Sequence, residues 1–182
     1  MSPFQQLALC PGHDPRRPAL EALIQGAFER RHGAQIHHFM PSLVGLWGAA
    51  GAPVGAAGLR SANQEPLFLE NYLDRPIEIE LAAVSGKPVL RSEVVEVGNL
   101  AGVTCRAACR LVAALPPLLL SQGHRWIVFT ATDTVRSVLN RLGAPLFEIA
   151  SARADRAPPG DQWGHYYTHD PRVMAGYLPS LR

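Results

Sequence analysis

The amino-acid sequence predicts one α/β (α+β) domain over residues 1–182, with a mixed central sheet and flanking helices. In the second half of the chain, short apolar segments alternate with helical segments, which is typical of parallel strands joined by crossover helices. The length of 182 residues suits a single domain. Hydrophobic residues make up 47% of the chain and charged residues 18%, so there is enough apolar material for a core.

The N-terminal third predicts an irregular lead-in, a helix and a hairpin. Residues 1–14 show no periodic pattern and form the lead-in. A helix is expected between Pro15 and Gly33, because proline suits a helix start and glycine suits its end. Residues 36–47 favour a strand, and residues 53–60 favour its return after a glycine-containing loop. The two segments together predict a β-hairpin.

The middle of the chain combines an ambiguous segment with a clear strand. Residues 67–73 suit either a short helix or an extended lid. Residues 77–81 alternate like a strand, but they follow Pro76 and favour a helix start. Residues 94–101 predict a short apolar strand that contains one carboxylate, and this strand is the centre of the predicted fold.

The second half predicts alternating helices and strands. A helix is expected over residues 104–115, and Pro116 and Pro117 are expected to kink or break it. The remaining predicted elements are a strand at 126–130, a helix from Thr132 or Asp133 to Gly143, a strand at 146–150, a polar loop at 151–162 and a last strand at 163–168.

Composition and charge exclude several function classes. The formal net charge of +2 argues against strong non-specific binding of nucleic acid. The longest apolar run, at 111–120, contains two prolines and is far shorter than the ~20 residues of a membrane helix, so stable membrane insertion is not expected. A basic region followed by an apolar run is missing at the N-terminus, and cysteines are sparse. These features predict a reduced, cytoplasmic protein.

Several common catalytic and metal motifs are missing. The sequence has no Gly-x-x-x-x-Gly-Lys loop, no Gly-x-Ser-x-Gly turn and no Gly-x-Gly-x-x-Gly, which argues against kinases, serine hydrolases and dinucleotide enzymes. The histidine and cysteine spacings lack the geometry of a zinc site, so no metal is predicted. Cys105 and Cys109 share one helical face. Buried small residues are the favoured interpretation of this pair, and a nucleophile is the alternative.

The candidate catalytic residues cluster around the central strand and near the C-terminus. Glu96 is a carboxylate among valines. Such a group is a tuned general base, a carboxylate that positions a substrate amine, or the structural partner of one of the arginines. Asn99 either holds a substrate by its amide or ends the strand. Tyr166 and Tyr167 point to opposite faces of a predicted strand, so one can lie in the core while the other protonates a leaving group.

The chain resembles the thermostable hemolysin family of bacterial proteins from about residue 38 to residue 178. Several long blocks in the same order carry the resemblance. The blocks are HFMPSLVGL at 38–46, AAGLRSANQEPLFLENYLDRPIE at 56–78, VVEVGNLAG at 94–102, GHRWIVFTAT at 123–132 and WGHYYTHDPRVMAG at 163–176. The order of elements also resembles the GNAT acyltransferase fold, in particular the acyl-homoserine-lactone synthases, and therefore implies a GNAT-like central sheet.

The GNAT resemblance implies roles for residues of the central strand and the C-terminal block. Glu96 would accept a proton from an amine, and backbone N–H groups near Gly98 and Asn99 would stabilise an oxyanion. Tyr166 would protonate the departing thiolate. The resemblance further implies that the acceptor is bound by the block at 56–78, through Tyr72, Asp74 and Glu78.

The resemblance also implies an acyl-thioester co-substrate, either coenzyme A or the phosphopantetheine of an acyl carrier protein. Gly102, Thr104 and Arg106 would occupy its pyrophosphate loop, but the usual glycine-rich loop of the fold is missing. The missing loop favours a carrier protein or a long-chain thioester over acetyl-CoA. The predicted helices carry Arg106, Arg110, Arg136 and Arg141, which either steer an acidic carrier or are solvated helix faces.

The resulting hypothesis is an N-acyltransferase that moves an acyl group from a thioester to a small amine, in lipid or secondary-metabolite biosynthesis. Two alternatives stay open. One is a cytolysin of the thermostable hemolysin type, and the other is a non-catalytic scaffold of a biosynthetic complex. The sequence leaves a homodimer open and identifies neither the acyl chain nor the acceptor.

Overall fold

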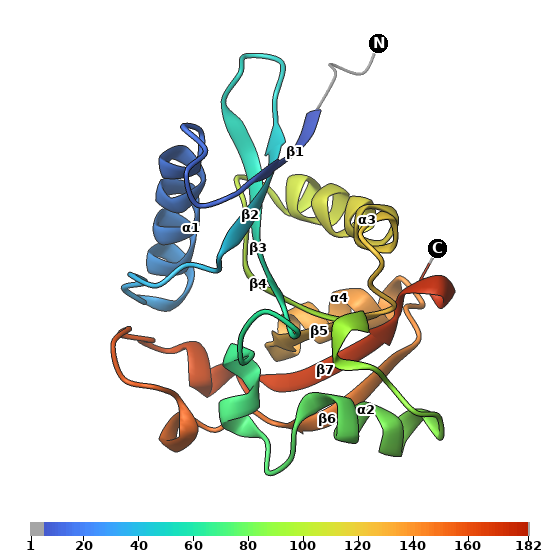
Figure 1. The fold of residues 1–182 in the computed structure, drawn as a ribbon. Coiled ribbons are helices and arrows are strands. Elements are labelled where there is room, and N and C mark those ends of the chain that lie inside the picture. The colour runs from blue at the N-terminus through green and yellow to red at the C-terminus, as the bar shows by residue number, and fades with distance from the viewer. Residues whose placement is uncertain (1–5, 182) are drawn as a thin grey trace. The chain divides into compact units, whose positions relative to one another are not determined.

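The computed structural model describes residues 6–181 of the chain (Figure 1). Its helices are α1 (Arg17–His32), α2 (Ile77–Ser85), α3 (Cys105–Ser121) and α4 (Asp133–Arg141). Its strands are β1 (Gln6–Cys10), β2 (Ser42–Trp47), β3 (Pro53–Ser61), β4 (Val94–Gly102), β5 (Trp126–Ala131), β6 (Leu146–Ser151) and β7 (Arg172–Tyr177). The strands form one seven-stranded sheet in the order β1-β2-β3-β4-β5-β7-β6. The sheet is mixed, as the sequence predicted.

The chain divides into two compact units. The first unit contains the residues up to Leu59, Gly98–Leu115 and Gly160–Gly164. The second unit contains Arg60–Val97, Pro116–Pro159 and the residues from His165 onward. The central strand β4 contributes its first four residues to the second unit and the rest to the first.

The first unit is built on antiparallel pairing of β1 with β2 and of β2 with β3. The pairing of β2 with β3 confirms the predicted hairpin. Helix α1 confirms the predicted helix, with a proline in its first turn and Gly33 in the left-handed conformation at its end. Leu20 and Ile24 of this helix pack against Leu43 of β2 in the core of the unit.

Two boundaries in the first unit differ from the sequence prediction. Residues 6–10 of the expected lead-in form β1, because backbone pairing with β2 orders an edge segment that has no strong apolar pattern. Residues 1–5 of the lead-in lie outside the described residues. The strand predicted to begin at residue 36 begins at Ser42. The carbonyl groups before it are bound by side chains of α1, since Arg17 donates to Met40 O and Gln25 donates to Ile36 O.

The second unit contains the parallel pair that the alternating pattern predicted. β4 pairs with β5 in parallel, from Val94 opposite Trp126 to Val97 opposite Phe129. β7 pairs antiparallel with both β5 and β6 and therefore lies between them. A cluster of buried side chains from β4, β5, β7, α2 and the segment before it forms the core of this unit.

The predicted last strand at 163–168 is wrong. A 3₁₀ helix occupies Tyr166–His169, and the last strand is β7 at Arg172–Tyr177. The aromatic residues of the earlier segment suggested a strand, but the backbone turns at Gly164, with φ of 53°, and at Asp170, with φ of 45°, on either side of the 3₁₀ helix. β7 buries four consecutive residues, as an interior strand does.

The helical predictions around the centre are confirmed with one exception. Residues 68–72 form a 3₁₀ helix, η1 (Phe68–Tyr72), and α2 begins directly after Pro76. However, α3 continues through Pro116 and Pro117 to Ser121 instead of ending before them. The buried leucines 111, 115 and 119, spaced by four residues, stabilise the helix on both sides of the prolines. No helix within residues 6–181 has the length and hydropathy needed to cross a membrane.

Candidate active site

The site residues expected from the sequence fall into both units. The second unit holds Tyr72, Asp74, Glu78, Glu96 and Tyr166. The first unit holds Gly98, Asn99, Gly102, Thr104 and Arg106.

Glu96 lies on β4 with 3% of its surface exposed. Its carboxylate accepts the backbone N–H of Phe68 at 2.7 Å on Oε2 and that of Leu69 at 3.0 Å on Oε1. These bonds tie the carboxylate to the first turn of η1. The partners of Glu96 are therefore backbone groups, and Arg60 acts on it only through its charge.

The environment of Glu96 raises the pKa of its carboxyl group to about 7. Burial is the main cause, because it disfavours the charged form. The two backbone N–H groups and the Arg60 charge oppose this effect in part. A carboxyl group with a pKa near neutrality can accept and release a proton at physiological pH, as a general base does.

A pair of tyrosine hydroxyls lies at the other end of η1. Tyr72 ends this 3₁₀ helix, and its hydroxyl is 2.6 Å from the hydroxyl of Tyr167. Burial raises the pKa of Tyr72, and the bond to Tyr167 and the nearby Glu96 charge raise it further. Because Glu96 binds the start of η1 and Tyr72 ends it, one short helix positions both groups.

Tyr166 and Tyr167 differ in their surroundings. Tyr166 is 9% exposed, and burial raises its pKa. Its ring meets that of Tyr167 edge-on, with ring centroids 5.3 Å apart. Tyr167 borders a depression of about 520 Å³. The other residues that line the depression are Ser151, Ala152, Arg153, Ala154, Asp155, Asp170 and Pro171. Tyr167 is thus the tyrosine of the two that reaches an open surface.

An ion-pair network beside η1 was missed by the sequence analysis. Arg91 binds both carboxylate oxygens of Glu70 at 2.7 Å and Oε2 of Glu78 at 2.8 Å. Glu70 also accepts the backbone N–H groups of Leu67 and Ile77, so it joins η1 to α2. The only sequence signal for Glu70 is its position in the block at 56–78. The charge of Glu78, a candidate acceptor ligand, is paired with Arg91.

Asp74 stands in a more open position. Its side chain is 89% exposed and pairs with Arg156 at 2.9 Å. Surface pairs of this kind are weak and exchange readily with solvent and ligands. Asp74 is therefore more available to a cationic molecule than Glu78.

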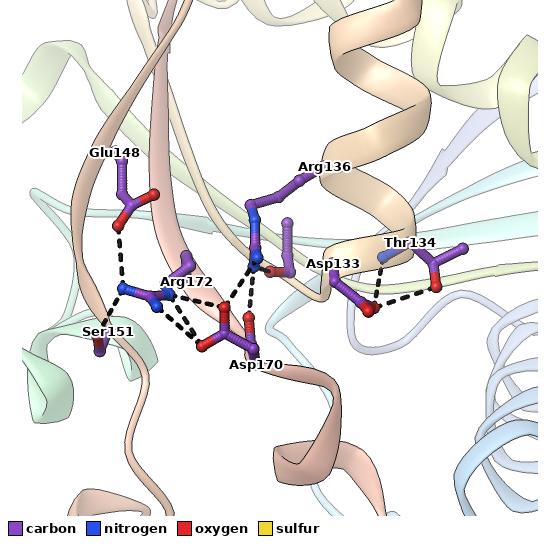
Figure 2. A network of polar contacts seen from close by, with 8 residues as sticks. Asp133, Thr134, Arg136, Glu148, Ser151, Asp170 and Arg172 are labelled. Atoms are coloured by element: carbon purple, nitrogen blue, oxygen red, sulfur yellow. Dashed lines mark hydrogen bonds and ion pairs between the residues drawn. The ribbon is translucent and has the colours of Figure 1, made fainter.

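Asp170 is the centre of a second ionic network, which Figure 2 shows. Arg136 donates to the carboxylate of Asp170 at 3.0 Å, to its carbonyl oxygen and to the carbonyl oxygen of Ala131. Arg172 binds the same carboxylate and also contacts Glu148 and Ser151. Both arginines lower the pKa of Asp170. Arg136, one of the arginines expected to attract a carrier protein, is thus held inside the protein's own network.

In the first unit, Asn99 has a structural contact. It adopts a positive φ of 49° within β4, and its Oδ1 accepts the backbone N–H of Met40 at 3.2 Å. Gly98 beside it faces the same methionine, because a Cβ there would lie 2.5 Å from Met40 Cε. Asn99 therefore anchors the segment before β2, and Gly98 leaves room for Met40.

The loop that follows β4 forms the start of α3. Thr104 caps the helix, since its Oγ1 accepts the N–H of Ala107 at 3.1 Å. A Cβ on Gly102 would lie 2.8 Å from Ala108 N, so the close turn requires glycine. Arg106 is exposed in the first helical turn. A helix N-terminus with a nearby arginine can bind a phosphate group.

The prediction that Cys105 and Cys109 are buried small residues is wrong. Cys105 is exposed and Cys109 is half-buried. The helical face that they share turns toward solvent, because the buried side of α3 is formed by its leucines.

The chain belongs to the thermostable hemolysin family, whose model matches residues 10–181. No curated protein matches the sequence. Among solved structures, the chain is similar to FeeM, an N-acyl amino acid synthase from uncultured soil microbes. The two are 16% identical with a TM-score of 0.65, and the match covers 98% of this chain and 93% of FeeM.

Two further structures share the fold. The CoA-dependent acyl-homoserine lactone synthase MesI is 17% identical with a TM-score of 0.57, over 97% of this chain and 91% of MesI. A GCN5-related N-acetyltransferase from Kribbella flavida is 15% identical with a TM-score of 0.55, over 94% and 97% of the two chains. At these identities the likeness establishes the fold, and the chain therefore has the predicted GNAT fold.

Proposed function

We propose that this member of the thermostable hemolysin family is an N-acyltransferase, which moves an acyl group from a thioester to a small amine. The observation that carries the proposal is the buried Glu96 carboxyl group, whose pKa is about 7. The fold supports the proposal, because its similar structures include an N-acyl amino acid synthase and an acyl-homoserine lactone synthase.

The proposed reaction is direct attack of the amine on the thioester carbonyl. The C–N bond forms as the amine loses a proton, and Glu96 accepts that proton through water because its carboxylate is buried. The tetrahedral oxyanion then collapses, the C–S bond breaks and the thiolate leaves. A tyrosine hydroxyl protonates this thiolate and regains a proton from Glu96 through water, so that the products are an amide and a thiol and both side chains return to their starting state.

Two tyrosine groups are candidates for the proton donor. Tyr166 is the residue that the family resemblance favours. The hydroxyl pair of Tyr72 and Tyr167 is a second candidate, because Tyr167 reaches an open depression. In either case burial raises the pKa of the hydroxyl, so the proton is present when the thiolate leaves, although the hydroxyl is a weaker acid than a free tyrosine.

The proposed donor site uses the residues at the start of α3. Backbone N–H groups at Gly98 and Asn99 are proposed to stabilise the oxyanion. Gly102, Thr104 and Arg106 are proposed to hold the phosphate of a phosphopantetheine arm, because the turn is tight and Arg106 is exposed. The donor class is an acyl thioester, on coenzyme A or on an acyl carrier protein.

The proposed acceptor is a cationic or zwitterionic amine. Asp74 is highly exposed, and its ion pair with the half-buried Arg156 leaves it open to solvent, so it can bind an ammonium group. Glu78 and Tyr72 are assigned to the same acceptor, with Glu78 held in place by Arg91.

The test incubates the purified protein with a panel of amino acids and either long-chain acyl-CoA or an acylated carrier protein. Thiol release and amide formation are measured. We expect an N-acyl product by mass spectrometry. Glu96→Gln should lower the turnover about 10²–10⁴-fold, which is the usual contribution of a general base. Glu29→Gln is the matched control, because Glu29 lies on the exposed side of α1. Full activity of Glu96→Gln, or no amide from any donor, would refute the proposal.

A direct cytolysin is the second candidate, and the description of the family favours it. Dye-loaded lipid vesicles separate the two functions. Release of dye by detergent-free protein without any thioester would support direct lysis. Release that requires the thioester and the amine would support the acyltransferase, with a lipidic product as the lytic agent.

A further inference from the structure

Two cysteine side chains meet at the solvent-facing side of α3. The sulfur atoms of Cys105 and Cys109 lie 4.0 Å apart, one helical turn from each other. Both thiols are free, and Cys105 is exposed. Burial raises the pKa of the Cys109 thiol, and the neighbouring Cys105 thiol raises it further. The first turns of the helix thus present an accessible pair of thiols.

The geometry of this pair fits a bridging atom better than a disulfide. A disulfide requires sulfur atoms about 2.05 Å apart and Cβ atoms about 3.5–4.5 Å apart. Residues four apart on a helix have Cβ atoms about 5–6 Å apart, so a disulfide would distort the helix. A tetrahedral ion with metal–sulfur bonds of about 2.3 Å holds two sulfurs about 3.8 Å apart. The separation of 4.0 Å lies close to that value.

We propose that Cys105 and Cys109 form a two-thiolate site for one soft, thiophilic centre, such as Cd²⁺ or a trivalent arsenical. Within residues 6–181 no third cysteine, histidine or carboxylate joins the pair. The remaining coordination positions are therefore open to water or to small external ligands. Thr104 caps the helical turn that carries the first thiol, because its Oγ1 accepts the N–H of Ala107.

Binding at this site has a predicted consequence for the acyl donor, and this consequence rests on the proposed function. The first thiol stands between Thr104 and Arg106, which are proposed to hold the donor phosphate. A bound ion would crowd that turn, so it should compete with the thioester. The two-thiolate site itself stands on the geometry of the sulfur pair and holds whether or not the protein transfers acyl groups.

The first test uses phenylarsine oxide and the full-length protein. Each molecule should condense with the two thiols, forming two arsenic–sulfur bonds and releasing one water with no change of oxidation state. Mass spectrometry should show one adduct per chain. Cys105→Ser and Cys109→Ser should each weaken binding about 10²-fold or more, because the second bond is intramolecular. Cys10→Ser is the matched control, since Cys10 is fully buried, and it should bind as the wild type does.

The second test titrates Cd²⁺ by calorimetry in buffers of different ionisation enthalpy. Thiolate ligands must lose their protons, so binding should release protons and strengthen as the pH rises. Both signals should vanish in either single cysteine variant, with the circular dichroism spectrum unchanged. Equal binding of Cd²⁺ or the arsenical by Cys105→Ser and the wild type would overturn the proposal, and so would no binding by the wild type. Competition with acyl-CoA, measured separately, tests only the predicted consequence.

Discussion

The carboxylate of Glu96 accepts the backbone N–H of Phe68 at 2.7 Å, although the two residues are 28 positions apart in the sequence. This bond joins the central strand to the 3₁₀ helix that ends at Tyr72. A change in the charge of Glu96 therefore affects both the candidate base and the helix that positions a candidate acid. The proposed catalytic role of Glu96 is thus tied to the stability of this helix.

The first prediction concerns stability against pH. The carboxyl group of Glu96 ionises near 4.5 in the unfolded chain and near 7 in the folded protein. The proton is thus bound more tightly by the folded state, so its stabilising contribution is complete below pH 4.5 and is lost as the pH rises through 7. Between pH 5 and pH 8, wild-type stability should fall by about 3 kcal/mol relative to Glu96→Gln.

Urea unfolding at several pH values measures this difference. The glutamine variant is the reference because it resembles the protonated acid and does not titrate. Glu29→Gln should follow the wild-type pH profile. Wild type and Glu96→Gln with parallel profiles would show that Glu96 does not change its protonation across this range.

The second prediction compares two arginines that bind glutamates. Arg91 has three short contacts with Glu70 and Glu78, and its side chain is 30% exposed. Arg91→Met should destabilise the protein by about 1–3 kcal/mol, because it leaves two partly buried carboxylates without their cation. Arg75→Met is the control. Arg75 is 55% exposed and pairs with Glu80 at the surface, so the loss should be below about 1 kcal/mol. Equal losses in denaturant unfolding would contradict this ranking.

The third prediction concerns the tyrosine hydroxyl pair. Tyr72→Phe and Tyr167→Phe should each cost about 1 kcal/mol, because each leaves the partner hydroxyl without its bond. The double variant should cost less than the two single losses added, with a coupling of about 0.5–1.5 kcal/mol in a double-mutant cycle. Tyr177→Phe is the control, because the hydroxyl of Tyr177 accepts a hydrogen bond from Arg125. Its loss of stability should add to that of Tyr72→Phe without coupling. Strict additivity at Tyr72 and Tyr167 would count against the bond.

The fourth prediction compares two glycines near the proposed donor site. A Cβ on Gly102 would approach backbone atoms, namely Ala108 N at 2.8 Å and Thr104 O at 2.9 Å. Gly102→Ala should therefore cost about 1–3 kcal/mol and weaken donor binding. A Cβ on Gly98 would approach only the flexible end of Met40, which can rotate away, so Gly98→Ala should cost below about 1 kcal/mol. Chemical denaturation measures both losses of stability. A larger loss for Gly98→Ala than for Gly102→Ala would contradict the prediction.

Elements with local signals were predicted well. Helix α1 has prolines at its start and glycine at its end, and these residues restrict the backbone wherever they occur. The apolar strand β5 and its parallel pairing with β4 followed from the alternation of elements. The same local reasoning failed at residues 163–168. Gly164 and Asp170 adopt positive φ values there and just beyond, and residue composition does not reveal these values. The predicted helix end before Pro116 and Pro117 was also wrong. The burial of leucines on α3 stabilises the helix by more than the two missing proline N–H bonds destabilise it.

The amino-acid sequence by itself determined the class of fold and the unusual position of Glu96, because an acid among valines on a central strand must be buried. Only the tertiary structure decided which groups surround that acid. Phe68, Leu69 and Arg60 come from other parts of the chain, and no local pattern links them to β4. The protonation of Glu96 depends on these neighbours, since burial raises its pKa while backbone donors lower it. Such a balance is set by three-dimensional packing, which residue order alone does not specify.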